Sequence, residues 1–432
     1  MKGTFAAAAA IFLLPASGAL AADAAAIDWS KIPAATIPLF YPGQSTYEWL
    51  RSPGHQKGQK AVEEGRACFS CHEDDEKDIG KKLVKGGNIE PTPVKDKAGS
   101  VDLKVQVAYD DKNAYFRLKW KTQNPYAGDE HRYIRFDGKE WKAYGGPKLD
   151  KDVQDGQQPA LSEDRVTMMI DDGKTPKFAQ QGCWLTCHNG SPATPNAATS
   201  DEIAGNALMK AENQSTVRKY LPVTRNDPGD WKTGKSPEEI AKLKAEGAFL
   251  DLIPWYAYRS NPVGMAGDGY VLESRLSDAG KEMFSENEDA ATHQPKFMWD
   301  EKKAGYKSIT EDQLHKAQHV LIKEQNAVAF DPKAGWKAGD MLPAYVLSAA
   351  DASGSAADDK ATGSWKDGEW TVVITRPLAL TNDDDKALKA GSTYNVGFAV
   401  HDDNVAGRGH FVSLVRSIGF GADGKIKAVK LP

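Results

Sequence analysis

This sequence has little cysteine, no long apolar run beyond the N-terminus and no excess of basic over acidic charge. Only four of its 432 residues are cysteine, and these stand in two short pairs, so none remains for a separate disulfide framework. Beyond the N-terminus, no apolar stretch approaches the roughly 20 residues of a transmembrane helix, so we expect no membrane span in the mature chain. The net charge of −5 argues against binding to nucleic acid, but suits docking onto a basic patch of a partner protein.

The N-terminus is expected to carry an export signal. Lys2 precedes a short run of small and apolar residues, Phe5 to Leu14, and Ala19-Leu20-Ala21 is a cleavage site of the small-x-small type. An uncleaved membrane anchor is the alternative, but the run is short for a bilayer and Pro15 interrupts it. We therefore expect a signal peptide over residues 1–21 and a mature protein in the periplasm. Loss of Lys2 would change the net charge from −5 to −6.

The first cysteine pair forms the motif Cys68-Phe69-Ser70-Cys71-His72. C-x-x-C-H is the attachment signature of c-type haem, in which two thiols add to the haem vinyl groups and the histidine binds the iron. A redox disulfide of the thioredoxin type is the alternative, but no βαβ pattern precedes the motif. We therefore expect Cys68 and Cys71 to hold a haem covalently and His72 to be a ligand of its iron.

The second pair has one more residue between its thiols, in Cys183-Trp184-Leu185-Thr186-Cys187-His188. C-x-x-x-C-H is a rarer form of the attachment motif, and its alternatives are a structural disulfide or a metal site. Because a histidine follows this pair as well, we expect a second haem on Cys183 and Cys187, with His188 at its iron. The predicted cofactors are therefore two covalently bound haem c groups, as in a two-electron relay.

The first haem iron needs a sixth ligand, which is histidine or methionine in a site that only carries electrons. No methionine lies between His72 and the first predicted strand. We favour His55, which follows Pro53-Gly54 in a predicted turn and is close to the motif in sequence. His131 and His293 are the alternatives.

For the second haem we favour His410 as the sixth ligand. The glycines on its N-terminal side permit a close approach of the backbone. Neighbouring Arg408 is expected to pair with a haem propionate. His315 and His319 stand four residues apart, which is also the spacing of two metal ligands on one helix face, although a solvent-exposed face is the simpler interpretation.

The remainder of the chain predicts a mainly β fold with α insertions. Residues 101–109 and 114–120 alternate apolar and polar side chains around a polar turn, which is typical of a β-hairpin. Further strands are expected at 165–170, 368–375, 393–400 and 410–420. Helices are expected at 55–72, 201–221, 236–247 and 310–324. We predict a small α-helical cytochrome c segment over 22–98, then an antiparallel β-sandwich haem-binding domain over 99–432 with helical inserts at about 192–364.

The stretch from about Val101 to Leu431 resembles a haem-binding domain family that is DMSO reductase-like. The family includes the gamma subunits of ethylbenzene dehydrogenase, dimethylsulfide dehydrogenase and related molybdenum enzymes. The residues that carry the resemblance are Val101 to Trp120, Glu163 to Val166, Trp365 to Trp370, Arg376 to Leu378, Tyr394 to Val400 and Gly407 to Ser413. The resemblance implies a β-sandwich with one haem in a pocket near its edge.

Those gamma subunits hold a non-covalent b-type haem between methionine and lysine. In our alignment the methionine position falls near Cys187-His188 and the lysine position falls at His410. The resemblance therefore implies that the same pocket holds a covalent haem between two histidines. The segment from about Thr46 to Gly87, with the first motif, lies outside the resemblance.

Three functions agree with these patterns. The favoured one is an exported dihaem c-type cytochrome that transfers electrons between a periplasmic redox enzyme, such as a molybdenum oxidoreductase, and another carrier such as a second cytochrome. The first alternative is a dihaem oxidoreductase, either a peroxidase or an enzyme of small oxyanions or sulfur compounds. It needs one open iron and acid–base groups such as His401, Asp402 and Asp403. The other is a ligand-binding sandwich with structural disulfides, which the two trailing histidines disfavour.

Overall fold

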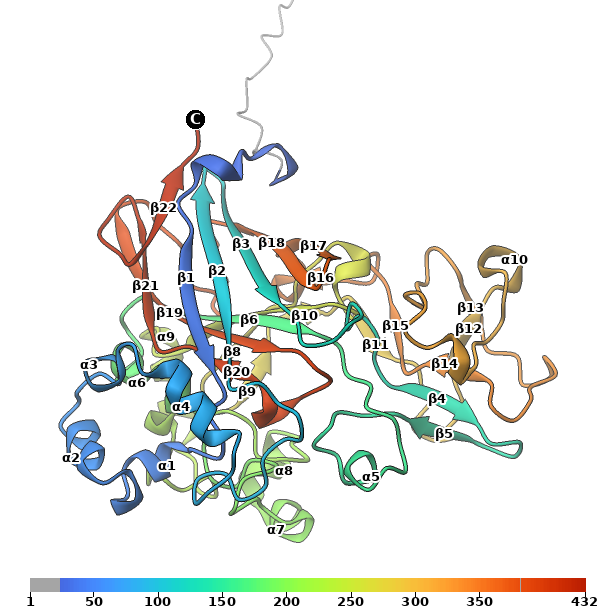
Figure 1. The fold of residues 1–432 in the computed structure, drawn as a ribbon, viewed down its shortest axis with the longest axis horizontal. Coiled ribbons are helices and arrows are strands. Elements are labelled where there is room, and N and C mark those ends of the chain that lie inside the picture. The colour runs from blue at the N-terminus through green and yellow to red at the C-terminus, as the bar shows by residue number, and fades with distance from the viewer. Residues whose placement is uncertain (1–23, 381) are drawn as a thin grey trace, which may run out of the picture.

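The computed structural model describes residues 24–380 and 382–432, so the predicted signal peptide lies outside the described residues. Within the described part, no helix is both long enough and apolar enough to cross a membrane. The fold is mainly β, as predicted, and its largest element is a 13-stranded sheet (Figure 1). Helices are short and gather mainly around one end of this sheet.

Two layers of antiparallel strands make up most of the large sheet. One layer contains, in spatial order, β17 (Lys360–Lys366), β18 (Glu369–Pro377), β3 (Asn113–Lys121) and β2 (Ser100–Tyr109). The other contains β19 (Ser392–His401), β6 (Arg165–Asp171), β7 (Leu250–Tyr256), β8 (Gly269–Val271) and β9 (Arg275–Ser277). The predicted hairpin is β2 and β3, which pair from Lys104↔Lys119 to Tyr109↔Ala114. Every second residue of β18 is buried, so one face of this strand lies against the core.

Shorter strands join the two layers along one edge. Near one end of this edge, β1 (Ala35–Phe40) pairs with β2 and with β20 (Phe411–Val412), and β20 pairs with β19. Farther along the same edge, β22 (Ile426–Lys430) pairs in parallel with β2 and with β21 (Arg416–Phe420), and β21 pairs with β19. The two layers are therefore continuous along this edge of the core. The single strand expected at 410–420 is divided into β20 and β21, which pair with different parts of β19.

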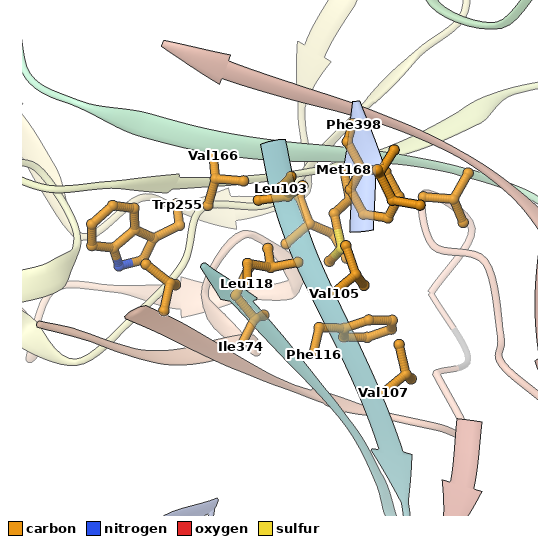
Figure 2. Close-up of a cluster of buried hydrophobic side chains, with 14 of the residues drawn as sticks. Leu103, Val105, Val107, Phe116, Leu118, Val166, Met168, Trp255, Ile374 and Phe398 are labelled. Atoms are coloured by element: carbon orange, nitrogen blue, oxygen red, sulfur yellow. The ribbon is translucent and has the colours of Figure 1, made fainter. Parts of the chain in front are cut away.

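The core fills the space between the layers with large apolar side chains. Figure 2 shows Leu103, Val105 and Val107 of β2 close to Phe116 and Leu118 of β3. All of these are buried in one cluster that also includes the following side chains of the other strands: Val166, Met168, Trp255, Ile374 and Phe398. Removal of this surface from water is the main force that holds the two layers together.

The N-terminal helices lie on this sandwich. They are α1 (Tyr47–Leu50), the 3₁₀ turn η3 (Pro53–His55), α2 (Lys57–Glu63), α3 (Phe69–His72) and α4 (Glu76–Leu83). The single helix expected over 55–72 was wrong, because Gln56 and Gly65 have positive φ angles of 46° and 82° that break it. A buried ion pair of 2.8 Å between Glu76 and Arg416 ties α4 to β21.

The helix α6 (Phe178–Gln181) precedes the second motif, and the first part of the long insertion contains three more short helices: α7 (Ser200–Gly205), α8 (Ala207–Ala211) and α9 (Pro237–Ala245). The helix expected at 236–247 is confirmed as α9, with Ser236 and Glu239 in a capping box. The helix expected at 201–221 ends early, since α8 stops at Ala211. The helix at 310–324 was wrong: only the 3₁₀ turn η7 (Glu311–Gln313) forms, and His315 has a positive φ of 61°.

The second part of the insertion forms a separate apolar cluster with residues 133–161. Its strands are β4 (Tyr133–Phe136), β5 (Trp141–Tyr144), β12 (Phe297–Trp299), β13 (Ala327–Ala329) and β14 (Met341–Pro343). Minor elements are α5 (Lys151–Gln154), α10 (Glu301–Ala304), β10 (Gly280–Lys281), β11 (Phe284–Glu286), β15 (Tyr345–Leu347) and β16 (Ser353–Gly354). Figure 1 places this cluster on the right, away from α1–α4 on the left.

Candidate functional site

The first motif lies on α3, whose single turn brings its reactive groups together. Cys68 caps the helix, and its carbonyl oxygen accepts hydrogen bonds from the backbone N–H groups of Cys71 (3.2 Å) and His72 (3.0 Å). This turn directs Cys68, Cys71 and His72 into one cavity of about 240 Å³. The expected grouping of these three residues is therefore present.

The walls of this cavity are mostly apolar. They come from the N-terminal helices, from β1 and from the region of the second motif, and include Phe40, Trp49, Leu50, Val62, Ile79, Leu83, Trp184 and Leu414. Burial raises the pKa of the Cys68 thiol to about 11, since an apolar environment disfavours the thiolate. Burial also lowers the pKa of His72, and His55 adds to this effect, so a neutral imidazole is favoured.

His55 faces His72 across this cavity. The ring centres are 6.2 Å apart and the ring planes differ by 22°. Two imidazoles on one iron, with iron–nitrogen bonds of about 2 Å, have ring centres roughly 6 Å apart. His55 Nδ1 lies 3.0 Å from the carbonyl oxygen of Leu50, which leaves Nε2 available for a metal. Cavity, thiols and opposed imidazoles thus fit a c-type haem.

The second motif lies against β19 of the sandwich. Cys183 lies in the 3₁₀ helix η4 (Gly182–Thr186) and is buried, and Cys187 caps the C-terminus of this helix. Two glycines allow this contact: a Cβ at Gly397 would lie 2.9 Å from Cys183 Sγ, and a Cβ at Gly182 would lie 2.7 Å from the Val415 side chain. All four cysteines of the described chain are free thiols in this structure.

His188 is buried and hydrogen-bonded at both ring nitrogens. Its Nδ1 lies 2.7 Å from Glu48 Oε1, and its Nε2 lies 3.0 Å from the carbonyl oxygen of Tyr220. The ring stacks on Tyr220 at 3.6 Å. Burial lowers the pKa of His188, and the Glu48 carboxylate acts in the opposite direction. Sequence reasoning missed Glu48, a carboxylate of the kind that orients metal-bound histidines.

Lys219 connects the second motif with His410. Its Nζ lies 3.4 Å from Cys187 Sγ. Burial, followed by the positive charge of Lys219, lowers the pKa of His410 to about 3. His410 stacks on His401 at 4.8 Å, and the Nδ1 of His401 is buried without a hydrogen-bond partner. The His410 Nδ1 contacts the Gly407 carbonyl oxygen, which leaves its Nε2 as the nitrogen available to a metal. Thiols and imidazoles are the donors that a c-type haem needs, so these residue types fit a second haem.

The other predicted residues lie in different environments. The Arg408 guanidinium binds Glu90, Tyr41 Oη (2.6 Å) and the carbonyl oxygen of Thr92 (3.0 Å). Among the described histidines, only His55 and His72 line the first cavity. The remaining candidates bind elsewhere: His131 packs on Tyr345, His293 binds Glu288, His315 binds Glu130 and His319 lies near Tyr306.

The two motifs are joined to each other by the backbone. Cys68 N–H donates to the carbonyl oxygen of Gln180 at 3.0 Å, three residues before Cys183. Tyr47 N–H in α1 donates to the carbonyl oxygen of Cys187 at 2.6 Å. Trp184, from inside the second motif, lines the first cavity. The motifs are far apart in sequence but form one continuous site.

Two named proteins are similar to this chain. It is 27% identical to "Cytochrome c-552" of Stutzerimonas stutzeri over 433 residues, which cover 100% of both chains. It is 28% identical to "Cytochrome c-551" of Rhodocyclus tenuis over 221 residues, which are 51% of this chain and 72% of that protein. A protein-family model described as ethylbenzene dehydrogenase matches residues 26–413, so the match extends N-terminal to the stretch in which the resemblance was expected. This chain belongs to the ethylbenzene dehydrogenase family.

Proposed function

We propose that this protein is an exported dihaem c-type cytochrome that transfers electrons. The observation that carries the proposal is the pair His55 and His72, with ring centres 6.2 Å apart across an apolar cavity that also receives Cys68 and Cys71. The names of the two similar proteins support the same function.

At the first site, each residue has a separate task. Cys68 and Cys71 would anchor the cofactor, and His72 and His55 would bind its iron. The Leu50 carbonyl fixes the orientation of His55, and the apolar walls exclude water. A haem held by these residues would supply one-electron chemistry, and two histidine ligands would suit electron transfer rather than substrate binding. Ligation by two histidines favours a lower potential than ligation by histidine and methionine.

At the second site, we propose that Cys183 and Cys187 anchor another haem and that His188 binds its iron. Glu48 keeps its contact with Nδ1, so the imidazole presents Nε2 to the metal. To bind a metal, Nε2 would have to give up its contacts with the carbonyl oxygens of Tyr220 and Leu185. His410, stacked on His401, is the second proposed ligand and would complete a pair of histidines.

The proposed partners are a periplasmic redox enzyme and a second electron carrier. The family match favours a molybdenum oxidoreductase as the enzyme, and another cytochrome suits the role of carrier. The contiguity of the two motifs supports transfer of electrons between two haems within one chain. No catalytic residue is assigned under this proposal.

The first test is the intact mass and absorption spectrum of the full chain exported together with a cytochrome c maturation system. We expect two covalent haems, both low-spin, and no rapid binding of carbon monoxide. His55→Ala should make one haem high-spin and reactive with carbon monoxide, whereas the control His293→Ala, on the exposed surface, should behave as wild type.

Two outcomes would overturn parts of this proposal. A mass increase of a single haem, unchanged by Cys187→Ser, would show that the second motif is not an attachment site. Rapid carbon monoxide binding by the reduced wild type would favour the dihaem enzyme with one open iron.

A further inference from the structure

A cluster of buried carboxylates lies at the end of the sandwich formed by β7, β8 and β9. Its members, here called the aspartate cluster, are Asp251, Asp268, Asp278, Asp358, Asp359, Asp384 and Asp385. They come from β7, the loops flanking β8 and β9, the turn before β17 and the connection between β18 and β19. All except Asp358 are less than 9% exposed.

Positive charge inside the cluster is insufficient to balance these carboxylates. Arg376, which is fully buried, binds Asp251 and Asp385, and its Nε is 4.0 Å from Asp359. Lys386 is adjacent in sequence, but its Nζ is directed to Asp172 at 2.8 Å and to a backbone carbonyl. Seven carboxylates therefore share one guanidinium, and burial of uncompensated charge is costly.

Several carboxylate oxygens in the cluster have no hydrogen-bond partner. Both oxygens of Asp359 are buried without a hydrogen-bond partner, and this side chain is fully inaccessible to solvent. One oxygen of Asp251, Oδ1, and one of Asp268, Oδ2, are also buried without a partner. Buried acceptors are nearly always paired in native proteins, so these oxygens are available to bind a ligand from outside the chain.

The oxygens converge on common points. Asp251, Asp268 and Asp385 each offer one oxygen, and these three lie within 4.8 Å of one another. Two further triplets have the same property: Asp268 with Asp358 and Asp359, and Asp278 with Asp384 and Asp385. Calcium–oxygen bonds of about 2.3–2.6 Å place two ligands of one ion no more than about 5 Å apart.

We propose that the aspartate cluster binds calcium. Only oxygen ligands are present, which suits a hard cation and disfavours zinc or copper, for which histidine or cysteine is usual. Calcium accepts six to eight oxygens in irregular geometry, whereas magnesium requires a near-ideal octahedron and retains water, so a crowded carboxylate cluster suits calcium better. Asp268 and Asp385 each belong to two triplets, so the ion binds where these triplets meet.

Such an ion would connect segments that are distant in sequence. Asp251 lies in β7 of the sandwich, while Asp358 and Asp359 lie in the turn just before β17. A cation bound to Asp251 and to Asp359 would hold this turn against the sheet. Its contribution is therefore to stability, and it is independent of haem attachment.

The test measures calcium binding and thermal unfolding of the full haem-loaded protein. After dialysis against calcium and removal of free ions, wild type should retain calcium by elemental analysis. Its melting temperature should fall by several degrees when EGTA replaces calcium, and magnesium should not restore it. Asp268→Asn, which keeps the side-chain shape, should weaken calcium binding by roughly tenfold or more. The difference in melting temperature between calcium and EGTA should be mostly lost in this variant. The control Asp201→Asn, on exposed α7, should retain the full shift.

The possible results test the calcium site separately from the two proposed haem sites. Wild type that carries two haems but retains no calcium and melts identically in calcium and EGTA would overturn the calcium site alone. An equal calcium shift in Asp268→Asn and Asp201→Asn would place the ion elsewhere and also overturn it. If Asp268→Asn does not fold, Asp359→Asn replaces it, and the calcium content of wild type still decides the question.

Discussion

At the scale of single residues, the first site depends on a position without a side chain. Gly58 lies in the first turn of α2, directly beside the ring of His55. A Cβ at this position would lie 2.4 Å from His55 Cε1 and 2.5 Å from Nε2. These distances are too short for a normal contact, so a Cβ at residue 58 would force the His55 ring to move from its present position.

Gly58→Ala is therefore expected to displace His55 from the proposed iron without unfolding the protein. Alanine is a better helix former than glycine by about 0.5–1 kcal/mol, so α2 itself should not be weakened. Most of the first haem should become high-spin and bind carbon monoxide, as measured by absorption spectroscopy. Gly205→Ala in α7 is the control, because its Cβ would meet nothing within 4 Å. Low-spin spectra in both variants would contradict the assignment of His55.

Sequence alone could identify some residues of the site but not their partners. Cys68, Cys71 and His72 stand in a local motif whose chemistry follows from its spacing. Glu48 binds His188 across 140 positions of sequence, and no local pattern connects the two. The aspartate cluster is dispersed in the same way, from Asp251 to Asp385, so only the folded chain brings its members together.

At the scale of elements, α8 ends on an unfavourable residue. Glu212 caps its C-terminus, where the helix dipole disfavours negative charge, and both carboxylate oxygens are buried without a hydrogen-bond partner. Burial raises the pKa of Glu212 to about 7, although Arg225 acts in the opposite direction. The folded state thus binds a proton that the unfolded state releases near pH 4.5, so stability falls as the pH rises from about 4.5 to about 7.

The substitution Glu212→Gln should remove this fall in stability with rising pH, because a glutamine side chain carries no titrating proton. At pH 8 the variant should be more stable than wild type by about 1 kcal/mol, after allowance for solvent screening, and at pH 4 the two should be similar. Thermal unfolding followed by circular dichroism at both pH values measures the difference. Glu246→Gln is a matched control, since Glu246 caps α9 in the same way but is exposed. The same gain at pH 4 and pH 8 would show that the carboxylate of Glu212 is not the cause.

Elements were predictable where the local pattern was strong. The alternation of apolar and polar residues over 101–109 and 114–120 predicted the ends of β2 and β3 to within one residue. The capping box at Ser236 predicted the start of α9. The helix expected at 310–324 fails because this segment packs its apolar residues against a separate cluster and needs a left-handed residue at His315. Tertiary packing overrides a weak helical periodicity in such a segment.

At the scale of the whole molecule, the edge that joins the two layers of the sandwich brings the two motifs together. β1 inserts between β2 and β20, and the helices that follow it carry the first motif. The second motif follows β6 and contacts β19 in the opposite layer. Trp184 lies where they meet: it lines the first cavity, stacks on Phe40 at 5.4 Å and donates from its indole N–H to Ser45 Oγ at 3.0 Å.

The position of Trp184 predicts that its indole lies on the path of electrons between the two proposed haems. Trp184→Leu keeps an apolar side chain but removes the ring, so both haems should still attach while transfer between them becomes slower. Rapid-mixing reduction, followed at wavelengths that distinguish the two haems, measures this rate. The smaller side chain should also lower stability by about 2–4 kcal/mol through the space it leaves.

The control for this prediction is Trp231→Leu. Trp231 is 7% exposed, close to the 6% of Trp184, but it belongs to a different apolar cluster and does not line the first cavity. The two variants should therefore lose similar stability, and only Trp184→Leu should slow transfer between haems. Equal rates in both variants would mean that electrons pass between the haems by another route, and the contact of the two motifs through Cys68 and Gln180 would be the next segment to change.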